Sequence, residues 1–465
     1  MPRFRFNPRR ARAGLPLAAC ALLAACVSVA VPPLPRGDLP PAWRNAVEGN
    51  TPTPDLHGWW ESFGDPQLDA LIDQALHDNL DVQQAALRLR AARALESVSD
   101  AEYKPQLAFR TLSLPTPEAT ANYFQAGFDA QWELGLFGRR QAERDIAAGE
   151  TGAAQAQWQS ARVSLVAEVV RAYLQLRGAQ TREKLLQEIA DAMQKKVRLI
   201  EVRERLRLAS RMDVEREEAD SAQAQAALAE PRAQIAQAAQ TLALLLGRNA
   251  PPEDLLVPKP LPVSTQTGFD SVPADLLRTR PEIAQAQAQV LKAAGELGIA
   301  HADRFPRIGL GGAITWAARV SGADHLGSVH RTAGLGPVID IPLFDWGMRA
   351  AAEYARDDEL KAAVLAYRQA VLQGVADVES ALAELHQARE AALHADESAQ
   401  ALQRSARMTS RLRELNQVDD VDVADANAAW WKAQLDAEQA REREGVACIA
   451  LYKALGGAPL PQDQQ

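Results

Sequence analysis

Pro342-Leu343-Phe344-Asp345-Trp346-Gly347 opens the stretch that decides the fold, since no further proline occurs before Pro459. Apolar side chains then recur at steps of three and four, the spacing of one face of an α-helix. The pattern fails over 416–422, where acidic residues gather. We therefore expect a helix of roughly seventy residues, about 100 Å long, then a tight turn and a returning helix of roughly thirty-five. The apolar residues of this face are Leu360, Val364, Tyr367, Val371, Val375, Val378, Leu382 and Leu385.

The composition agrees with long helices. The chain has 465 residues, enough for two or three ordinary domains, but only 5% of them are aromatic. Ala, Gln, Leu, Arg and Glu dominate, which is typical of helical bundles and coiled coils. The formal net charge of −9 argues against a nucleic-acid-binding surface, which requires clustered Lys and Arg.

The amino terminus carries a targeting signal. A basic segment precedes the apolar run Ala13–Ala25, which is too short to span a bilayer, so residues 1–25 are predicted to be a secretory signal peptide. Leu23-Ala24-Ala25-Cys26 resembles the lipobox of bacterial lipoproteins, in which the cysteine becomes the acylated first residue. Cys20, which follows Leu17-Ala18-Ala19, is the alternative site, and an ordinary signal peptide with incidental cysteines is the other interpretation. Cys448 is expected to be a small buried hydrophobe, and the one or two cysteines that are left over cannot form a disulfide framework.

The helical and extended segments form two similar series. Asp65-Pro66 is a typical start for a helix that we expect to continue to about Glu102. Proline-rich, aperiodic sequence marks a tether and a crossover. The expected segments are the tether 26–58, the first repeat 59–248 with helices 66–102, 139–210 and 213–246, the crossover 249–271, the second repeat 272–458 with a first helix 276–303, and the tail 459–465.

Four strands are predicted from alternation. Over 122–136 the apolar residues fall on one face, and glycine or small polar residues fall on the other. The expected strands are about 105–113, 122–136, 306–317 and 334–343, joined within each pair by the short loops Leu114–Ala121 and Ala317–Arg331. The apolar positions expected to form a wall are Phe124, Phe128, Trp132, Leu134, Ile308, Leu310, Ile314, Trp316, Ile339 and Ile341.

The two series match at nearly constant spacing, which indicates a tandem duplication. Each repeat reads as helix, strand pair, very long helix, turn and shorter helix. The matched positions are Pro105 with Pro306, Phe137-Gly138 with Phe344-Asp345, Asp213 with Asp422, and Leu246-Gly247 with Leu455-Gly456.

The strands decide the class of function. Apolar and polar residues alternate as in a transmembrane β-barrel wall, although a soluble antiparallel sheet with one buried face has the same pattern. Four strands cannot close a barrel, whose smallest known walls have eight strands. Because an open sheet edge does not occur within lipid, a barrel interpretation requires several chains to contribute strands.

These features together resemble the outer-membrane efflux factors of the TolC/OprM type, and the lipidated NodT subgroup most of all. The resemblance covers 59–457 and rests on the duplicated plan, Leu-Ala-Ala-Cys26, the Trp60, Phe63, Asp65 and Leu68 pattern, and 342–347. It implies a mostly α, α+β membrane protein that forms, as a homotrimer, a twelve-stranded transmembrane β-barrel continued by a periplasmic α-helical barrel. It also implies a lipid-anchored channel of the outer membrane that reaches into the periplasm and docks with a periplasmic adaptor protein and an inner-membrane pump.

The resemblance assigns a gate to the second turn. Asp422-Val-Ala-Asp425 matches the acidic pair that constricts the periplasmic end in this family, and Asp213 is at the equivalent turn of the first repeat. Asp419 and Asp420 are further candidates, because Val418 stands where the family has a basic partner. Three copies of Asp422 and Asp425 around an axis would form carboxylate rings. The alternative is a solvated turn whose Asp residues only cap a helix.

No pattern indicates catalysis. The seven histidines show no metal-ligand spacing, and the sequence has no Cys-x-x-Cys, no P-loop and no Gly-x-Ser-x-Gly. The expectation is a passive exit duct that is not an enzyme, with no metal, no cofactor except a covalent lipid, and no nucleic-acid partner. Two alternatives stay open: the outer-membrane component of type I protein secretion, and a lipid-anchored periplasmic coiled-coil scaffold or adaptor without a pore.

Overall fold

The computed structural model describes residues 30–34, 43–45, 56, 58–114, 122–264, 280–321 and 325–457. Cys20, Cys26 and the loop 115–121 lie outside the described residues. The chain divides into two units, each described here by itself. Unit 1 comprises the described parts of 1–35, 88–155 and 284–369, and unit 2 comprises those of 36–87, 156–283 and 370–465.

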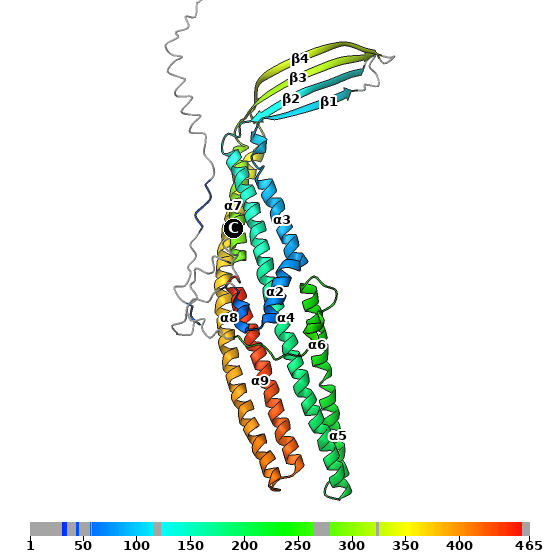
Figure 1. The fold of residues 1–465 in the computed structure, drawn as a ribbon. Helices are drawn as coiled ribbons and strands as arrows, with labels where there is room; N and C mark the ends of the chain where they lie inside the picture. Colours follow the sequence, from blue (N-terminus) through cyan, green and yellow to red (C-terminus); the bar gives the residue numbers. More distant parts are fainter. Residues whose placement is uncertain are drawn as a thin grey trace, which may run out of the picture. The chain divides into compact units, whose positions relative to one another are not determined.

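The helices and strands occur in two similar series (Figure 1). The first series is α2 (Pro66–Asp78), α3 (Leu80–Glu96), β1 (Gln106–Leu114), β2 (Asn122–Glu133), α4 (Arg139–Arg205), α5 (Arg211–Ala226) and α6 (Ala229–Leu245). The second series is α7 (Pro281–Ala302), β3 (Arg307–Ser321), β4 (His325–Asp340), α8 (Met348–Glu414) and α9 (Asp420–Ala454). Three short 3-10 helices are η1 (Trp59–Phe63), η2 (Ala101–Tyr103) and η3 (Glu253–Leu256).

The predicted long helix and its returning partner are present. α8 has 67 residues and α9 has 35, and the turn between them overlaps the stretch where the apolar pattern fails. Leu360, Val371, Val378, Leu382 and Leu385 are buried, as their spacing on one face requires. None of the helices that the structure describes is both long and apolar enough to pass through a bilayer.

The duplication is closer than the sequence comparison suggested, and one of its matches is wrong. α4 and α8 both have 67 residues and begin 209 positions apart, at 139 and 348. Before each helix an aromatic residue and a glycine have positive φ: Phe137 (57°) and Gly138 (83°), then Trp346 (56°) and Gly347 (86°). The counterpart of Phe137-Gly138 is therefore Trp346-Gly347 and not Phe344-Asp345. The repeated phenylalanine misled the comparison, whereas the backbone conformation identifies the equivalent residues.

Two expected helices are interrupted. The helix expected over 66–102 breaks at Asn79, whose backbone is extended and whose side-chain oxygen accepts from the N–H groups of Asp81 (3.0 Å) and Val82 (3.1 Å). This side chain caps α3 and so competes with continuation of α2. The helix expected over 213–246 ends at Ala226 and restarts at Ala229, because the ring of Pro231 clashes with the carbonyl of residue 227.

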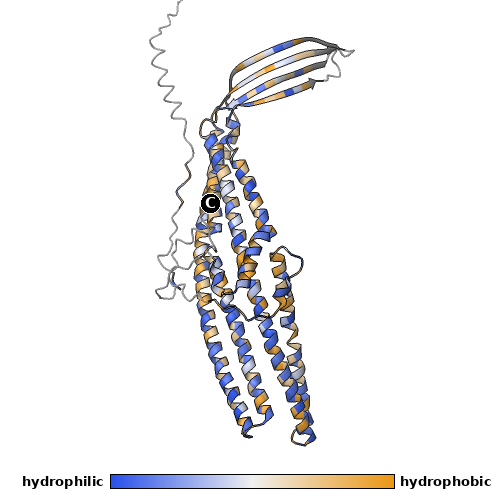
Figure 2. Ribbon diagram, in the orientation of Figure 1, coloured by the Kyte–Doolittle hydropathy of each residue, from blue (hydrophilic) through white to orange (hydrophobic). Residues whose placement is uncertain are grey.

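The four strands form one antiparallel sheet in the order β1-β2-β3-β4, which lies in unit 1. Both β1 and β4 are edges, with no further strand beside them among the described residues. Apolar and polar residues alternate along much of the sheet, as the colours of Figure 2 show. The sheet is therefore two-faced and open on both sides.

The strand boundaries differ from the prediction. β3 continues to Ser321 and β4 begins at His325, so most of the expected loop Ala317–Arg331 is strand. The apolar alternation stops there, but the hairpin ladder continues, with Ala317 opposite His330. In the other direction β2 ends at Glu133 and β4 at Asp340, earlier than 136 and 343. The period of the side chains therefore does not mark where the backbone pairing stops.

A buried arginine holds the crossover after α6 against α4 in unit 2. Arg177 is fully buried and donates to Gln67 Oε1 (2.7 Å), Gln180 Oε1 (2.7 Å) and the Val257 carbonyl (2.8 Å). Its guanidinium lies 4.8 Å from the centre of the Tyr173 ring. These acceptors offset part of the desolvation of the buried cation, whose Nε has no hydrogen-bond partner among the described residues.

Candidate channel surfaces

The sheet separates its side chains into an apolar sheet face and a polar sheet face. Backbone register places Phe128 opposite Ile314, Trp132 opposite Leu310, and Ile308 opposite Ile339. Opposite residues of an antiparallel pair share a face. The predicted wall residues that lie within strands therefore share the apolar sheet face, and they are Phe124, Phe128, Trp132, Ile308, Leu310, Ile314, Trp316 and Ile339.

Two predicted wall residues are not in strands. Leu134 and Ile341 lie just beyond the ends of β2 and β4. The Leu134 N–H still donates to the Ile308 carbonyl at 3.1 Å, so pairing continues for one step past the assigned end of β2. Many large side chains of the apolar sheet face are exposed in the isolated chain, Phe109, Phe128 and Ile339 among them. An exposed apolar band of this kind indicates a surface that lipid or another chain covers.

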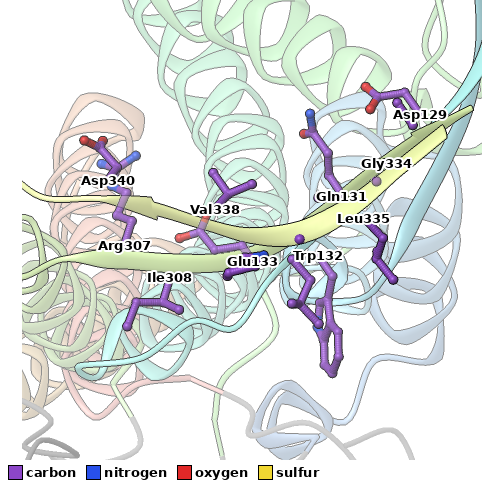
Figure 3. A pocket seen from close by; sticks show the side chains of 17 residues that line it. Asp129, Gln131, Trp132, Glu133, Arg307, Ile308, Gly334, Leu335, Val338 and Asp340 are labelled. Carbon is purple, nitrogen blue, oxygen red and sulfur yellow. The ribbon is translucent and has the colours of Figure 1, made fainter. Parts of the chain in front are cut away.

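The polar sheet face is hollowed. A cavity of about 590 Å³ lies against the sheet, and most of its lining belongs to the polar sheet face, including the charged groups of Asp129, Glu133, Arg307 and Asp340. Residues of the apolar sheet face also line it: Trp132, Ile308, Leu310 and Leu335. Figure 3 shows the side chains of Asp129, Val338 and Asp340 on the opposite side of the sheet from Ile308, Trp132 and Leu335. The sheet curves so that the polar sheet face is concave, as the water-filled side of a barrel must be.

The acidic turn residues lie in unit 2, at the ends of the paired long helices (Figure 1). Asp419 is the N-cap of α9, and its carboxylate accepts from the N–H groups of Val421 (2.8 Å) and Asp422 (3.1 Å). The Asp422 carboxylate accepts from the Asp419 N–H at 3.0 Å, which completes a capping box. Asp213 forms the same box with Ser210 at the start of α5. Capping is thus part of what these residues do.

The same turns are held by ion pairs that the sequence did not predict. Lys196 on α4 lies 3.0 Å from Glu217 on α5 and 2.9 Å from Asp425 on α9. Arg203 on α4 pairs with Asp419, and Arg413 donates to Asp420 at 2.6 Å. Each of the five predicted gate carboxylates is therefore engaged within its own subunit. Lys196 and Arg203 belong to one repeat and their α9 partners to the other, so no local pattern could reveal these pairs.

Asp419 and Asp420 of the turn stay ionised until the pH is well below neutral. Burial raises the pKa of Asp419, but hydrogen bonds from the Asp422 and Val421 N–H groups and the Arg203 guanidinium outweigh it and hold that pKa below its ordinary value. Hydrogen bonding to Arg413 likewise lowers the pKa of Asp420. Since the folded-state pKa values are lowered, these contacts stabilise the turn above the ordinary Asp pKa of about 3.9 and are lost as the pH falls further.

No group of three or more His, Cys, Asp or Glu side chains in the described part of the chain is arranged to hold a metal ion. The described residues instead form a concave polar surface, an exposed apolar surface and helix turns that are joined by ion pairs. Such surfaces suit a water-filled pore and a narrowing at its end.

Comparison with known proteins identifies the family. The model of the family described as outer membrane efflux protein matches residues 71–248 and 272–457. The pyoverdine export outer membrane protein OpmQ of Pseudomonas aeruginosa is 27% identical over 95% of this chain and 96% of its own length. The probable outer membrane lipoprotein SilC of Salmonella typhimurium is 27% identical over 94% and 96%.

Solved structures agree. The outer-membrane channel OprN superimposes with a TM-score of 0.79 at 29% identity, over 94% of this chain and 100% of the other. The open state of the MtrE outer-membrane channel of Neisseria gonorrhoeae gives 0.78 at 25% identity, over 94% and 100%. The expected fold and the expected class of function are thereby confirmed. The chain belongs to the outer membrane efflux protein family, and it is an efflux channel of the outer membrane.

Proposed function

We propose that three copies of this chain form one exit duct, with a twelve-stranded β-barrel in the outer membrane and a helical barrel in the periplasm. The observation that carries this proposal is the open four-stranded sheet. Its edges β1 and β4 have no partner strand within the described residues, and its apolar sheet face is exposed. Unpaired backbone groups cost several kcal/mol each in lipid, so the edges must be closed by strands of other subunits.

The duct serves a tripartite efflux system in this proposal. An inner-membrane pump supplies the energy, and a periplasmic adaptor joins the pump to the duct. The described residues contain an acid-lined turn and a polar concave sheet but no nucleotide-binding motif, which supports a passive role. Small organic compounds are the proposed cargo, because relatives carry the names pyoverdine export protein and toluene efflux pump outer membrane protein. Type I protein secretion is the competing role, and loss of secreted proteins from a deletion strain would favour it.

Purified full-length protein should run as a trimer-sized band in unheated gels and conduct ions across a planar lipid bilayer. The two edges require partners to form a closed wall, and a closed wall encloses water. Outer-membrane fractions and single-channel recording provide the measurements. A monomer that stays non-conducting after reconstitution would contradict the channel and favour the lipid-anchored scaffold.

We further propose that Cys26 carries the lipid, in a mature chain that begins at that residue. Labelling with radioactive palmitate should disappear in Cys26→Ser and persist in Cys20→Ser, because a lipobox cysteine is the single acylation point. Buried acyl chains contribute about 0.8 kcal/mol per CH₂, so the unlabelled variant should also be released more readily from membranes. Loss of label in Cys20→Ser alone would move the site to Cys20.

A further inference from the structure

The chain already contains one junction between a first-repeat strand and a second-repeat strand. β2 pairs with β3, and the register sets Gln131 opposite Gly311 and Trp132 opposite Leu310. A trimer needs a second kind of junction, between β4 of one subunit and β1 of the next. Because the two repeats are equivalent, the β2–β3 junction is a template for this missing seam.

The equivalence is exact enough to transfer a register. The two hairpins pair Gln106 with Gln131 and Arg307 with Asp340. The first strands therefore correspond at a spacing of 201 positions (106 and 307) and the second strands at 209 (131 and 340). The latter spacing is also that between the starts of α4 and α8.

We propose that β4 pairs antiparallel with β1 of a second copy, in the same register as the β2–β3 junction. This inference rests on the proposed trimer. Gln131 opposite Gly311 then becomes Asp340 opposite Arg110 of the partner subunit. Trp132 opposite Leu310 becomes Ile341 opposite the partner's Phe109. The seam thus joins a carboxylate to a guanidinium on the polar sheet face and two exposed apolar side chains on the other.

The charges and faces support this register, since neither was used to derive it. Arg307 already lies opposite Asp340 within the chain, so the seam places Asp340 between two arginines. A slip of one residue would set Asp340 opposite Phe109 and mix the two faces. A slip of two would keep the faces but set Val338 opposite Arg110, and the charge pair would be lost.

Backbone directions agree as well. The Ile308 carbonyl accepts from Leu134, so Ile308 turns its backbone groups toward β2. Ile339 is opposite Ile308, so these two residues form no mutual backbone hydrogen bonds, and the backbone groups of Ile339 point away from β3 into the seam. Those of Ile341, two residues farther along, point the same way. Asp340 and the partner's Arg110 then form a pair without mutual backbone hydrogen bonds, in which side chains come closest. Pro337 omits one hydrogen bond from this ladder.

The base of the sheet supplies a second contact. Within the chain Phe137 stacks on Phe305, with ring centres 4.9 Å apart and planes 12° apart. Their repeat counterparts are Trp346 and Lys104. The side chain of Trp346 is 90% exposed and Lys104 is exposed beside Asp100 at 2.9 Å. Trp346 is therefore placed over the ammonium of the partner's Lys104, a cation–π contact in the position of the internal stack.

Disulfide trapping tests the register in the full-length protein. Val338 and the partner's Leu112 are opposite in the proposed seam, as Asp129 and Ala313 are in the template. Oxidation of Val338→Cys/Leu112→Cys should produce covalent trimers in non-reducing gels. The matched control Val338→Cys/Arg110→Cys, which tests the register shifted by two residues, should produce few. Within one chain Leu112 is level with His330 of β4, three strand spacings or about 14 Å away, and Val338 lies eight residues farther along β4, so the two positions are too far apart for a disulfide.

The native cysteine gives little background. Cys448 is buried, and burial raises the pKa of its thiol to about 12. Each single cysteine variant should accordingly stay monomeric in the denaturing gel. More trimer from the control pair than from the matched pair overturns the register.

Trp346→Ala and Lys104→Gln provide a second readout, the temperature at which trimers dissociate in detergent. Each variant should lower the dissociation temperature, and the double variant should lower it no further than the larger single effect. Lys104→Arg should leave the dissociation temperature unchanged. Additive effects would overturn the aromatic contact. If the trimers conduct but neither cysteine pair forms disulfides, the proposed seam is wrong and the proposed channel is not. A non-conducting monomer would contradict both proposals.

Discussion

Replacement of Lys196 by methionine is expected to raise the time-averaged conductance of single channels several-fold, because the channel is open for a larger fraction of the time. Lys196 is 14% exposed and joins α4 to Glu217 on α5 and Asp425 on α9. Methionine keeps the apolar stem but removes the charge, so both carboxylates lose their partner. A partly buried pair is worth about 1 kcal/mol, which corresponds to a roughly five-fold shift between closed and open turns. Recording from the reconstituted protein measures the change.

The matched control is Lys361→Met, because among the described residues Lys361 pairs with Asp357 and Asp358 of its own helix and with no carboxylate of another element. Its conductance should match that of the unmodified channel. Asp422→Ala/Asp425→Ala should shift conductance in the same direction as Lys196→Met and reduce cation selectivity, if the carboxylates also line the constriction. Unchanged conductance in both gate variants would mean that the turn does not gate the channel and that Asp419 and Asp422 only cap α9.

Acid should act on the same contacts within a narrow range. Because the pKa values of Asp419 and Asp420 are lowered, their pairs with Arg203 and Arg413 persist from neutral pH down to about pH 4. Gating by these pairs should therefore be constant over that range and weaken only below it.

The second large effect is on stability: Arg177→Met should lower the free energy of unfolding by about 3 kcal/mol or more. The fully buried guanidinium donates hydrogen bonds to Gln67, Gln180 and the Val257 carbonyl. The methionine side chain has no donor and makes none of them. Loss of these three hydrogen bonds costs more than the similar volume of methionine recovers. Thermal unfolding followed by the helical circular dichroism signal, with the yield in outer-membrane fractions, provides the measurement.

Arg232→Met is the control, because Arg232 pairs with Glu183 at 2.8 Å but is 57% exposed. Its effect should stay below about 1 kcal/mol, since exposed pairs contribute little. Equal losses in both variants would mean that Arg177 does no more than any surface arginine, and the crossover would need another anchor.

The strands show how far sequence patterns reach. Alternation predicted a two-faced sheet and its apolar residues, because a pleated strand sends successive side chains to opposite sides whatever its neighbours are. It misplaced the ends, as over Ala317–Arg331, because the backbone ladder continues where the side chains no longer alternate. The break at Asn79 was missed for a similar reason: a local cap outweighed an uninterrupted helical pattern.

The turn shows the limit more sharply. The acidic residues from Asp419 to Asp425 were visible in the sequence, and helix capping by aspartate is a local property. Their basic partners were not, since Lys196 and Arg203 are more than two hundred positions away along the chain. Nothing in the spacing of one helix specifies which residue of another helix will face it.

The sequence by itself determined the two long helices and their order in the chain, the two faces of the sheet and the duplication, because periodicity is a property of each segment alone. Only the tertiary structure decided that Trp346-Gly347 and not Phe344-Asp345 repeats Phe137-Gly138, since that equivalence rests on backbone dihedrals. It also decided which charges meet at the turn and which strand edges are left open, because both depend on packing between segments distant in the chain.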